Sequence, residues 1–223
     1  MAYRLTPFVP GEWYHCYTRS IDKGAVFRES KDYERFLETI YLCNGSEQVR
    51  RHDLRDPSHA DFFQVNRGEP LVAIGAYCLM PNHFHLLIKE ESEKGISKFM
   101  HRVGTSFTKY FNIKNDRVGN VFIKPFRSKH IHDHLYFKKV AQYIHLNPAE
   151  IYESGWKSGN IRNMDLLKKQ LERYTYSSLA DYRGIKRIEN LILDQNSKEL
   201  FESLPPLEEI VDEAAAYYKE LSI

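Results

Sequence analysis

The strongest constraint on the fold is a pair of apolar runs that follow each other closely. Residues 71–80 and 83–89 are separated only by Pro81-Asn82. Each run is much shorter than the roughly 20 residues that a membrane-spanning helix needs, and a Pro-Asn pair favours a tight turn. The two runs therefore predict neighbouring antiparallel strands in a sheet.

The remaining elements follow from local patterns. Aromatic and β-favouring residues predict a strand over 12–20, and apolar residues at three- and four-residue steps predict helices. Ser30 is a candidate cap for the first helix, and Asn44-Gly45 favours its end. The expected helices cover residues 30–44, 96–113, 133–146 and 207–221, with a charged loop over 46–70 and a turn leading into a short strand over 117–123.

Composition excludes several classes of protein. With 42% hydrophobic residues, the 223-residue chain has the content of an ordinary globular domain rather than of a disordered one. The first four residues, Met-Ala-Tyr-Arg, lack the apolar core of a signal peptide, so we expect a cytosolic protein without membrane association. Cys16, Cys43 and Cys78 have no CxxC spacing and are predicted to be free, buried thiols.

Charge is distributed unevenly along the chain. Residues 190–223 contain eight acidic residues and two lysines, whereas the rest contains 30 basic and 22 acidic residues. Within the basic part, residues 101–139 hold nine Lys or Arg interleaved with seven aromatic residues. This pattern fits single-stranded nucleic acid, whose phosphates bind cations and whose bases stack on rings. The alternative is a solvated helix face over an ordinary aromatic core.

Two histidines at period-two spacing form a candidate metal site. On a strand, His83 and His85 face the same side, while Phe84, Leu86 and Ile88 face the other. Two imidazoles on one face can bind one cation, but a third ligand must come from elsewhere. The alternative is a pair of ordinary surface or core histidines.

A second stretch offers that ligand. Tyr143 and Asn147 are four residues apart, hence one turn apart on the same face of a helix. A carboxamide oxygen suits Mg²⁺ or Mn²⁺, and a phenol beside it can reach a phosphate. Read alone, Tyr143 is a helix residue that packs on a sheet and Asn147 ends the helix before Pro148. Tyr136, seven residues earlier, is a rival nucleophile.

These stretches resemble a known family. His83-Phe84-His85, within Cys-Leu-Met-Pro-Asn-His-Phe-His-Leu-Leu-Ile, is similar to the HUH motif of the IS200-like transposases, in the branch of the REP-associated tyrosine transposases. Tyr143-Ile-His-Leu-Asn147-Pro148 resembles the Tyr-x-x-x-Asn-Pro signature of that branch. The likeness extends over roughly residues 13–182. The loop at 46–70 is longer than the family pattern, and the acidic tail has no counterpart in it.

The resemblance implies an α/β (α+β) fold: a single compact domain with a central antiparallel sheet, helices on one face, the ferredoxin-like arrangement of HUH endonucleases and a C-terminal helical extension. It implies an IS200-like transposase domain over residues 1–150, a family extension over 151–182 and an acidic helical tail over 183–223. A homodimer in the bacterial cytosol, associated with the nucleoid, is the expected functional unit.

The implied activity is cleavage and rejoining of single-stranded, hairpin-forming DNA through a 5′-phosphotyrosine. The main alternative is a non-cleaving protein that binds hairpin DNA or RNA, which a buried tyrosine would favour; another is a metal-dependent hydrolase of small phosphate esters. The implied nucleophile is Tyr143, the implied ligands of Mg²⁺ or Mn²⁺ are His83, His85 and Asn147, and the candidate DNA phosphate contacts are Arg117, Lys124, Arg127 and Lys129.

Overall fold

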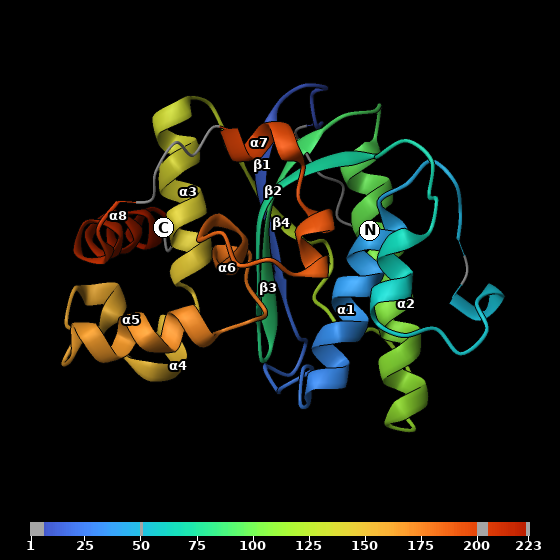
Figure 1. Ribbon diagram of the computed structural model, residues 1–223, viewed down its shortest axis with the longest axis horizontal. Coiled ribbons are helices and arrows are strands. Elements are labelled where there is room, and N and C mark those ends of the chain that lie inside the picture. Colours follow the sequence, from blue (N-terminus) through green and yellow to red (C-terminus); the bar gives the residue numbers. More distant parts are fainter. Residues whose placement is uncertain (1–6, 50, 200–204, 222–223) are drawn as a thin grey trace.

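The centre of the protein is an antiparallel sheet (Figure 1). The computed structural model describes residues 7–49, 51–199 and 205–221. Within them the sheet has four strands in the order β2-β3-β1-β4, and every neighbouring pair is antiparallel. The strands are β1 (Trp13–Arg19), β2 (Val72–Met80), β3 (His83–Glu90) and β4 (Arg127–Ile131).

The first elements follow the order β1-α1-β2-β3-α2-β4, which with this strand order is the ferredoxin-like arrangement. The predicted α/β fold with a central antiparallel sheet is therefore confirmed. None of the described helices is long and apolar enough to cross a membrane. The helices are α1 (Ser30–Cys43), α2 (Gly95–Lys114), α3 (His134–Leu146), α4 (Ala149–Tyr152), α5 (Met164–Arg173), α6 (Leu179–Tyr182), α7 (Gln195–Glu199) and α8 (Leu207–Leu221).

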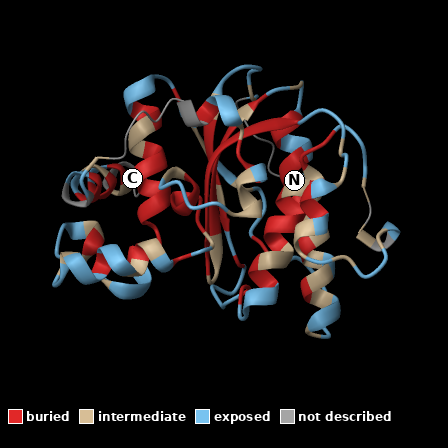
Figure 2. Ribbon diagram, in the orientation of Figure 1, coloured by how far each residue is buried: buried red, intermediate tan, exposed pale blue. Residues whose placement is uncertain are grey.

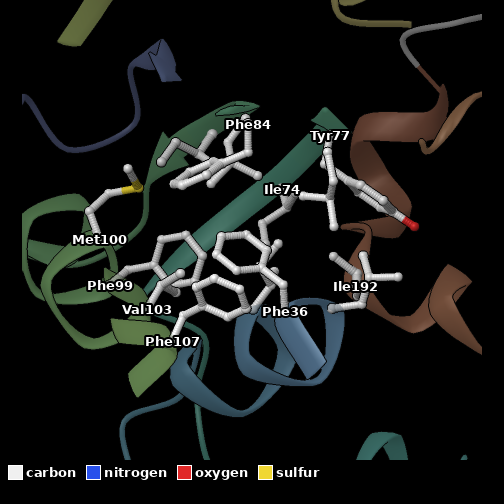
Figure 3. Close-up of a cluster of buried hydrophobic side chains, with 14 of the residues drawn as sticks. Phe36, Ile74, Tyr77, Phe84, Phe99, Met100, Val103, Phe107 and Ile192 are labelled. Carbon is white, nitrogen blue, oxygen red and sulfur yellow. The ribbon is translucent and has the colours of Figure 1, made fainter. Parts of the chain in front are cut away.

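One face of the sheet is closed by α1 and α2. Phe84 and Leu86 of β3 point to this face, as their spacing predicted, and pack in one apolar cluster with Phe36 of α1 and Phe107 of α2 (Figure 3). Both helices present apolar residues every three or four positions, so each buries one stripe against the sheet. This core holds β3 rigidly and leaves its other face for the histidines.

The other face is also covered, so the expectation of helices on one face only is wrong for the whole chain. Figure 1 shows α3, α5 and α8 on the side of the sheet away from α1 and α2. The reason lies in β2, which is buried along its whole length (Figure 2). Its residues Ala76, Cys78 and Met80 join a second apolar cluster with α3 and α8. A strand that is apolar on both faces needs a layer on each side.

Three local predictions are corrected. The cap of α1 is Glu29, one residue before Ser30, and it forms a capping box with Asp32. Residues 117–123 contain no strand beyond a bridge at Phe122; the fourth strand follows at Arg127–Ile131. The 46–70 segment is not only a loop, since a short 3₁₀ helix, Ala60–Gln64, buries two phenylalanines in the α1 core. None of the three cysteines forms a disulfide, and Cys43 is only half-buried.

Candidate functional site

The two histidines of β3 lie on the sheet face that α3 covers. His85 is buried and His83 is half-buried. Their ring centroids are 5.1 Å apart and the rings are nearly perpendicular, at 83°. The strand periodicity therefore places both imidazoles in one local site, as predicted.

Helix α3 brings the second stretch to these histidines. Its start is stabilised by Asp133, whose carboxylate accepts a hydrogen bond from the Tyr136 N–H at 2.7 Å. At its other end, the Tyr143 and His85 ring centroids are 5.5 Å apart. The Asn147 side chain donates to the Tyr143 carbonyl at 2.9 Å and lies within hydrogen-bonding reach of His83 and of the Tyr143 hydroxyl. All four predicted residues thus meet at one place.

Tyr136 lies elsewhere on α3. Its ring packs against Tyr217 of α8, with centroids 5.5 Å apart, and stacks on His132. The Tyr143 ring, in contrast, lies against that of His85, with centroids 5.5 Å apart, and its hydroxyl is within hydrogen-bonding reach of the Asn147 side chain. The geometry therefore favours Tyr143 over Tyr136 as the tyrosine of the site.

Strand β1 contributes three residues that the sequence reasoning missed. In the sheet register Tyr17 lies opposite His85 and Arg19 lies opposite His83. His15 forms a hydrogen bond between its Nε2 and the His85 Nδ1 at 2.8 Å. The sequence does contain a pattern that could have revealed them: His15, Tyr17 and Arg19 alternate with residues that face the core, so all three share one face of the strand.

Both imidazoles have the chemistry of metal ligands. The His83 Nδ1 lies 2.6 Å from the Asn82 Oδ1, so this nitrogen carries the proton and the Nε2 lone pair is left for a ligand. Burial lowers the pKa of His83 to about 4 and that of His85 well below its ordinary value, so both rings are neutral at pH 7. Two neutral imidazoles with the Asn147 carboxamide fit a divalent cation. Among the described residues, no group of three or more His, Cys, Asp or Glu forms a competing metal site.

Tyr143 is covered by the C-terminal helix α8. Only 3% of its surface is exposed, and its ring contacts Tyr217 and Tyr218 of α8 at centroid distances of 5.1 and 6.4 Å. Burial, followed by the nearby Glu150 charge, raises the pKa of the Tyr143 hydroxyl above its ordinary value. In this conformation the phenol is neutral, and it can meet a phosphate only if α8 shifts.

The four basic residues predicted to contact DNA are divided by the fold. Lys129 and Arg127 of β4 lie opposite His15 and Tyr17, respectively, so their side chains belong to the face of the site. Lys124 is exposed just before β4. Arg117 instead lies at the end of α2, where it donates to the Asn112 carboxamide at 3.2 Å on the other side of the sheet.

The aromatic residues interleaved with these cations are mostly core residues. Phe107, Phe111, Phe122 and Phe137 are each at most 4% exposed. Phe107 and Phe111 lie on the buried stripe of α2, Phe137 lies on that of α3, and Phe122 packs in the first apolar cluster. Buried rings of this kind cannot stack on bases. For most of this stretch the alternative interpretation, a charged surface over an aromatic core, is therefore correct.

We expect the metal-free protein to lose stability as the pH falls from 7 to 5. Burial lowers the pKa of His15 and His145 to about 3 and that of His83 to about 4, whereas the unfolded chain titrates near 6.5. The unfolded state therefore binds protons first, and stability present above pH 6.5 is lost progressively as the pH falls toward 3–4. Each ring contributes about 2 kcal/mol to this loss by pH 5.

Urea unfolding in EDTA at pH 7 and pH 5 measures the effect. His145→Gln is the informative variant, because His145 bonds Ser178 at 2.8 Å, away from the other histidines, and glutamine can keep that bond. Its loss of stability between the two pH values should be about 2 kcal/mol smaller than that of the wild type. An unchanged loss would show that His145 is not held neutral in the native state.

Comparison with known proteins gives two matches. Residues 39–147 match the model of the family described as "Transposase IS200 like", and this segment ends at Asn147 and includes both histidines and Tyr143. The fold is similar to the solved structure of a REP-associated tyrosine transposase bound to a REP hairpin, with 15% identity and a TM-score of 0.53 over 85% of this chain and 90% of that one. No curated protein sequence matches the chain. Residues 39–147, which contain His83, His85, Tyr143 and Asn147, are therefore similar to the IS200-like transposases.

Proposed function

We propose that the protein binds hairpin-forming single-stranded DNA and cleaves and rejoins it through Tyr143. The observation that supports this most is the meeting of Tyr143, His83, His85 and Asn147 from a helix and a strand far apart in the sequence. All four lie within the segment that matches the transposase family. The solved relative of the same fold was bound to a hairpin.

The residues that would hold a divalent cation, Mg²⁺ or Mn²⁺, are His83, His85 and Asn147. Such a cation withdraws negative charge from a bound phosphate and so makes the phosphorus easier to attack. Two cationic side chains lie beside this site: Arg19 and Lys157 are close enough to His83 and His85 to lower the pKa of both rings. The same positive charges attract a phosphodiester.

The chemical step is a transesterification. The Tyr143 oxygen attacks phosphorus, a phosphorus–oxygen bond to the tyrosine forms, and the bond to the 3′ oxygen of the neighbouring nucleotide breaks. Tyr143 gives up one proton and the departing 3′ oxygen takes up one, with no change in oxidation state. The products are a 5′-phosphotyrosine and a free 3′-hydroxyl, and attack by a 3′-hydroxyl on this link restores the phosphodiester.

We further propose that Arg127 and Lys129 contact DNA phosphates, and we retain Lys124 and Arg117 as weaker candidates. If neutralisation of phosphates dominates, the logarithm of the binding constant for single-stranded DNA falls with log salt by about 0.7 for each phosphate contacted. Arg127→Glu should make this slope shallower by about 0.7 or more.

The matched control is Lys98→Glu, an exposed charge reversal on α2, across the sheet from the site. Its salt slope should equal that of the wild type in a fluorescence anisotropy titration with a hairpin oligonucleotide. Equal slopes for both variants would remove Arg127 from the DNA interface. A hydrolase of small phosphate esters would show no such salt dependence.

A second candidate function is favoured by one observation. Tyr143 is buried beneath α8, which is the arrangement expected of a protein that binds hairpin DNA or RNA without cutting it. The predicted homodimer is compatible with either function and stays a prediction.

One experiment separates the two functions. The protein is incubated with hairpin oligonucleotides carrying single-stranded flanks and Mn²⁺ or Mg²⁺, and the products are separated under denaturing conditions. An adduct of protein and DNA that survives denaturation, together with a free 3′-hydroxyl fragment, is the result that cleavage through Tyr143 requires. Tight hairpin binding without adduct or cut strand establishes the non-cleaving function instead.

A further inference from the structure

We propose that His15 is a positioning residue that holds His85 with its Nε2 directed to the ligand side of the site. The inference rests on the proposed function, because the role of His15 is to orient a ligand of the proposed metal site. It concerns a residue outside the segment that matches the family and outside both sequence motifs.

His15 is fully buried and uses both of its ring nitrogens. Its Nε2 lies 2.8 Å from the His85 Nδ1, and its Nδ1 lies 2.9 Å from the Tyr217 hydroxyl of α8. The His15 ring also lies against Tyr143, with centroids 5.8 Å apart. Burial and two short hydrogen bonds leave the ring little freedom to rotate.

The hydrogen-bond chain from Tyr217 through His15 to His85 allows two arrangements of protons. A neutral imidazole carries one N–H, so of the two facing nitrogens one donates and the other accepts. In the first arrangement, which matches that of His83, the Tyr217 hydroxyl accepts from the His15 Nδ1–H. His15 then carries its proton on Nδ1, and its Nε2 accepts from the His85 Nδ1–H.

This arrangement leaves the His85 Nε2 with a lone pair. The opposite arrangement would place the His85 proton on Nε2 and block that nitrogen as a ligand. His83 is oriented in the same sense, because its Nδ1–H is bound by Asn82. Each imidazole therefore has a partner on Nδ1 that presents Nε2, the kind of outer partner that tunes metal affinity.

The test measures Mn²⁺ binding and the His85 tautomer. In isothermal titration calorimetry at pH 7, His15→Phe should raise the Mn²⁺ dissociation constant about 10- to 100-fold, because the ring volume is kept but the acceptor for His85 is lost. His15→Gln should retain most of the wild-type affinity, because its carboxamide oxygen can accept the same bond. Nitrogen-15 spectra of the metal-free wild type should show His85 protonated on Nδ1.

The matched control is His130→Phe, which changes an exposed histidine of the neighbouring strand β4 and should leave Mn²⁺ affinity unchanged. A folded His15→Phe protein that binds Mn²⁺ as tightly as the wild type would overturn the inference. So would His85 protonated on Nε2, a measurement that needs neither a variant nor a metal. If the wild type binds no Mn²⁺ at all, the proposed metal site is wrong, while the tautomer still decides the role of His15.

Discussion

Tyr143→Phe is expected to abolish the covalent adduct between protein and hairpin DNA. The substitution removes only the oxygen that attacks phosphorus, and loss of a covalent nucleophile lowers the rate on the order of 10⁴-fold or more. The phenylalanine ring keeps the contacts with His85 and Tyr217, so hairpin affinity in anisotropy measurements should stay close to that of the wild type. Denaturing gels of the reaction read out the adduct.

The matched control is Tyr136→Phe, which removes the same oxygen from the same helix, two turns earlier. That protein should still form the adduct, because the Tyr136 ring packs on His132 and Tyr217 rather than on His85. Each variant loses a hydrogen bond worth about 1 kcal/mol, so their stabilities should be comparable. Adduct formation by Tyr143→Phe but not by Tyr136→Phe would show that the site uses the other tyrosine.

His83→Ala is expected to eliminate metal-dependent cleavage and to weaken Mn²⁺ binding severely. One of two imidazole ligands is lost, and the remaining donors, His85 and Asn147, are too few to hold the ion. The cost to folding is small, because His83 is half-buried and its hydrogen bond to Asn82 is worth about 1 kcal/mol. Cleavage assays across a Mn²⁺ titration, with thermal unfolding of the same samples, separate the two effects.

His101→Ala provides the comparison, since His101 is an exposed histidine on α2, across the sheet. It should cleave with the Mn²⁺ dependence of the wild type. Cleavage by His83→Ala at the wild-type rate and Mn²⁺ concentration would show that the imidazole pair is not the metal site. Hairpin binding without a metal requirement in both variants would be consistent with phosphate contacts made by side chains alone.

The cover that α8 places over Tyr143 affects how these assays are read. In the described conformation the phenol is neutral and enclosed by Tyr217 and Tyr218. A slow or absent wild-type reaction with strong hairpin binding would therefore favour the non-cleaving function. In that case the role of His15 would be decided by the nitrogen-15 measurement of the His85 tautomer. A fast reaction requires that DNA binding displace α8 from the phenol.

Much of the local structure could be predicted from the sequence. Period two on β3 determines that His83 and His85 share a face, and the four-residue step on α3 determines that Tyr143 and Asn147 share another. The prediction failed for β4, since Arg127–Ile131 is a mostly polar edge strand with little apolar alternation. It failed also for the aromatic residues of the basic stretch, because a ring at helical spacing can face either the core or a ligand.

Tertiary structure alone decided how these faces meet. The pairing of β1 with β3 brings His15 to His85 across 70 residues of sequence, and the return of α8 brings Tyr217 to His15 across 202. Such contacts depend on which strands pair with each other and on which helix packs on which face, and the period within one segment does not name its partner. The sequence by itself determined which side chains share a strand or helix face. The packing of α3 and α8 on the second face of the sheet decided that they form one site and that its tyrosine is covered.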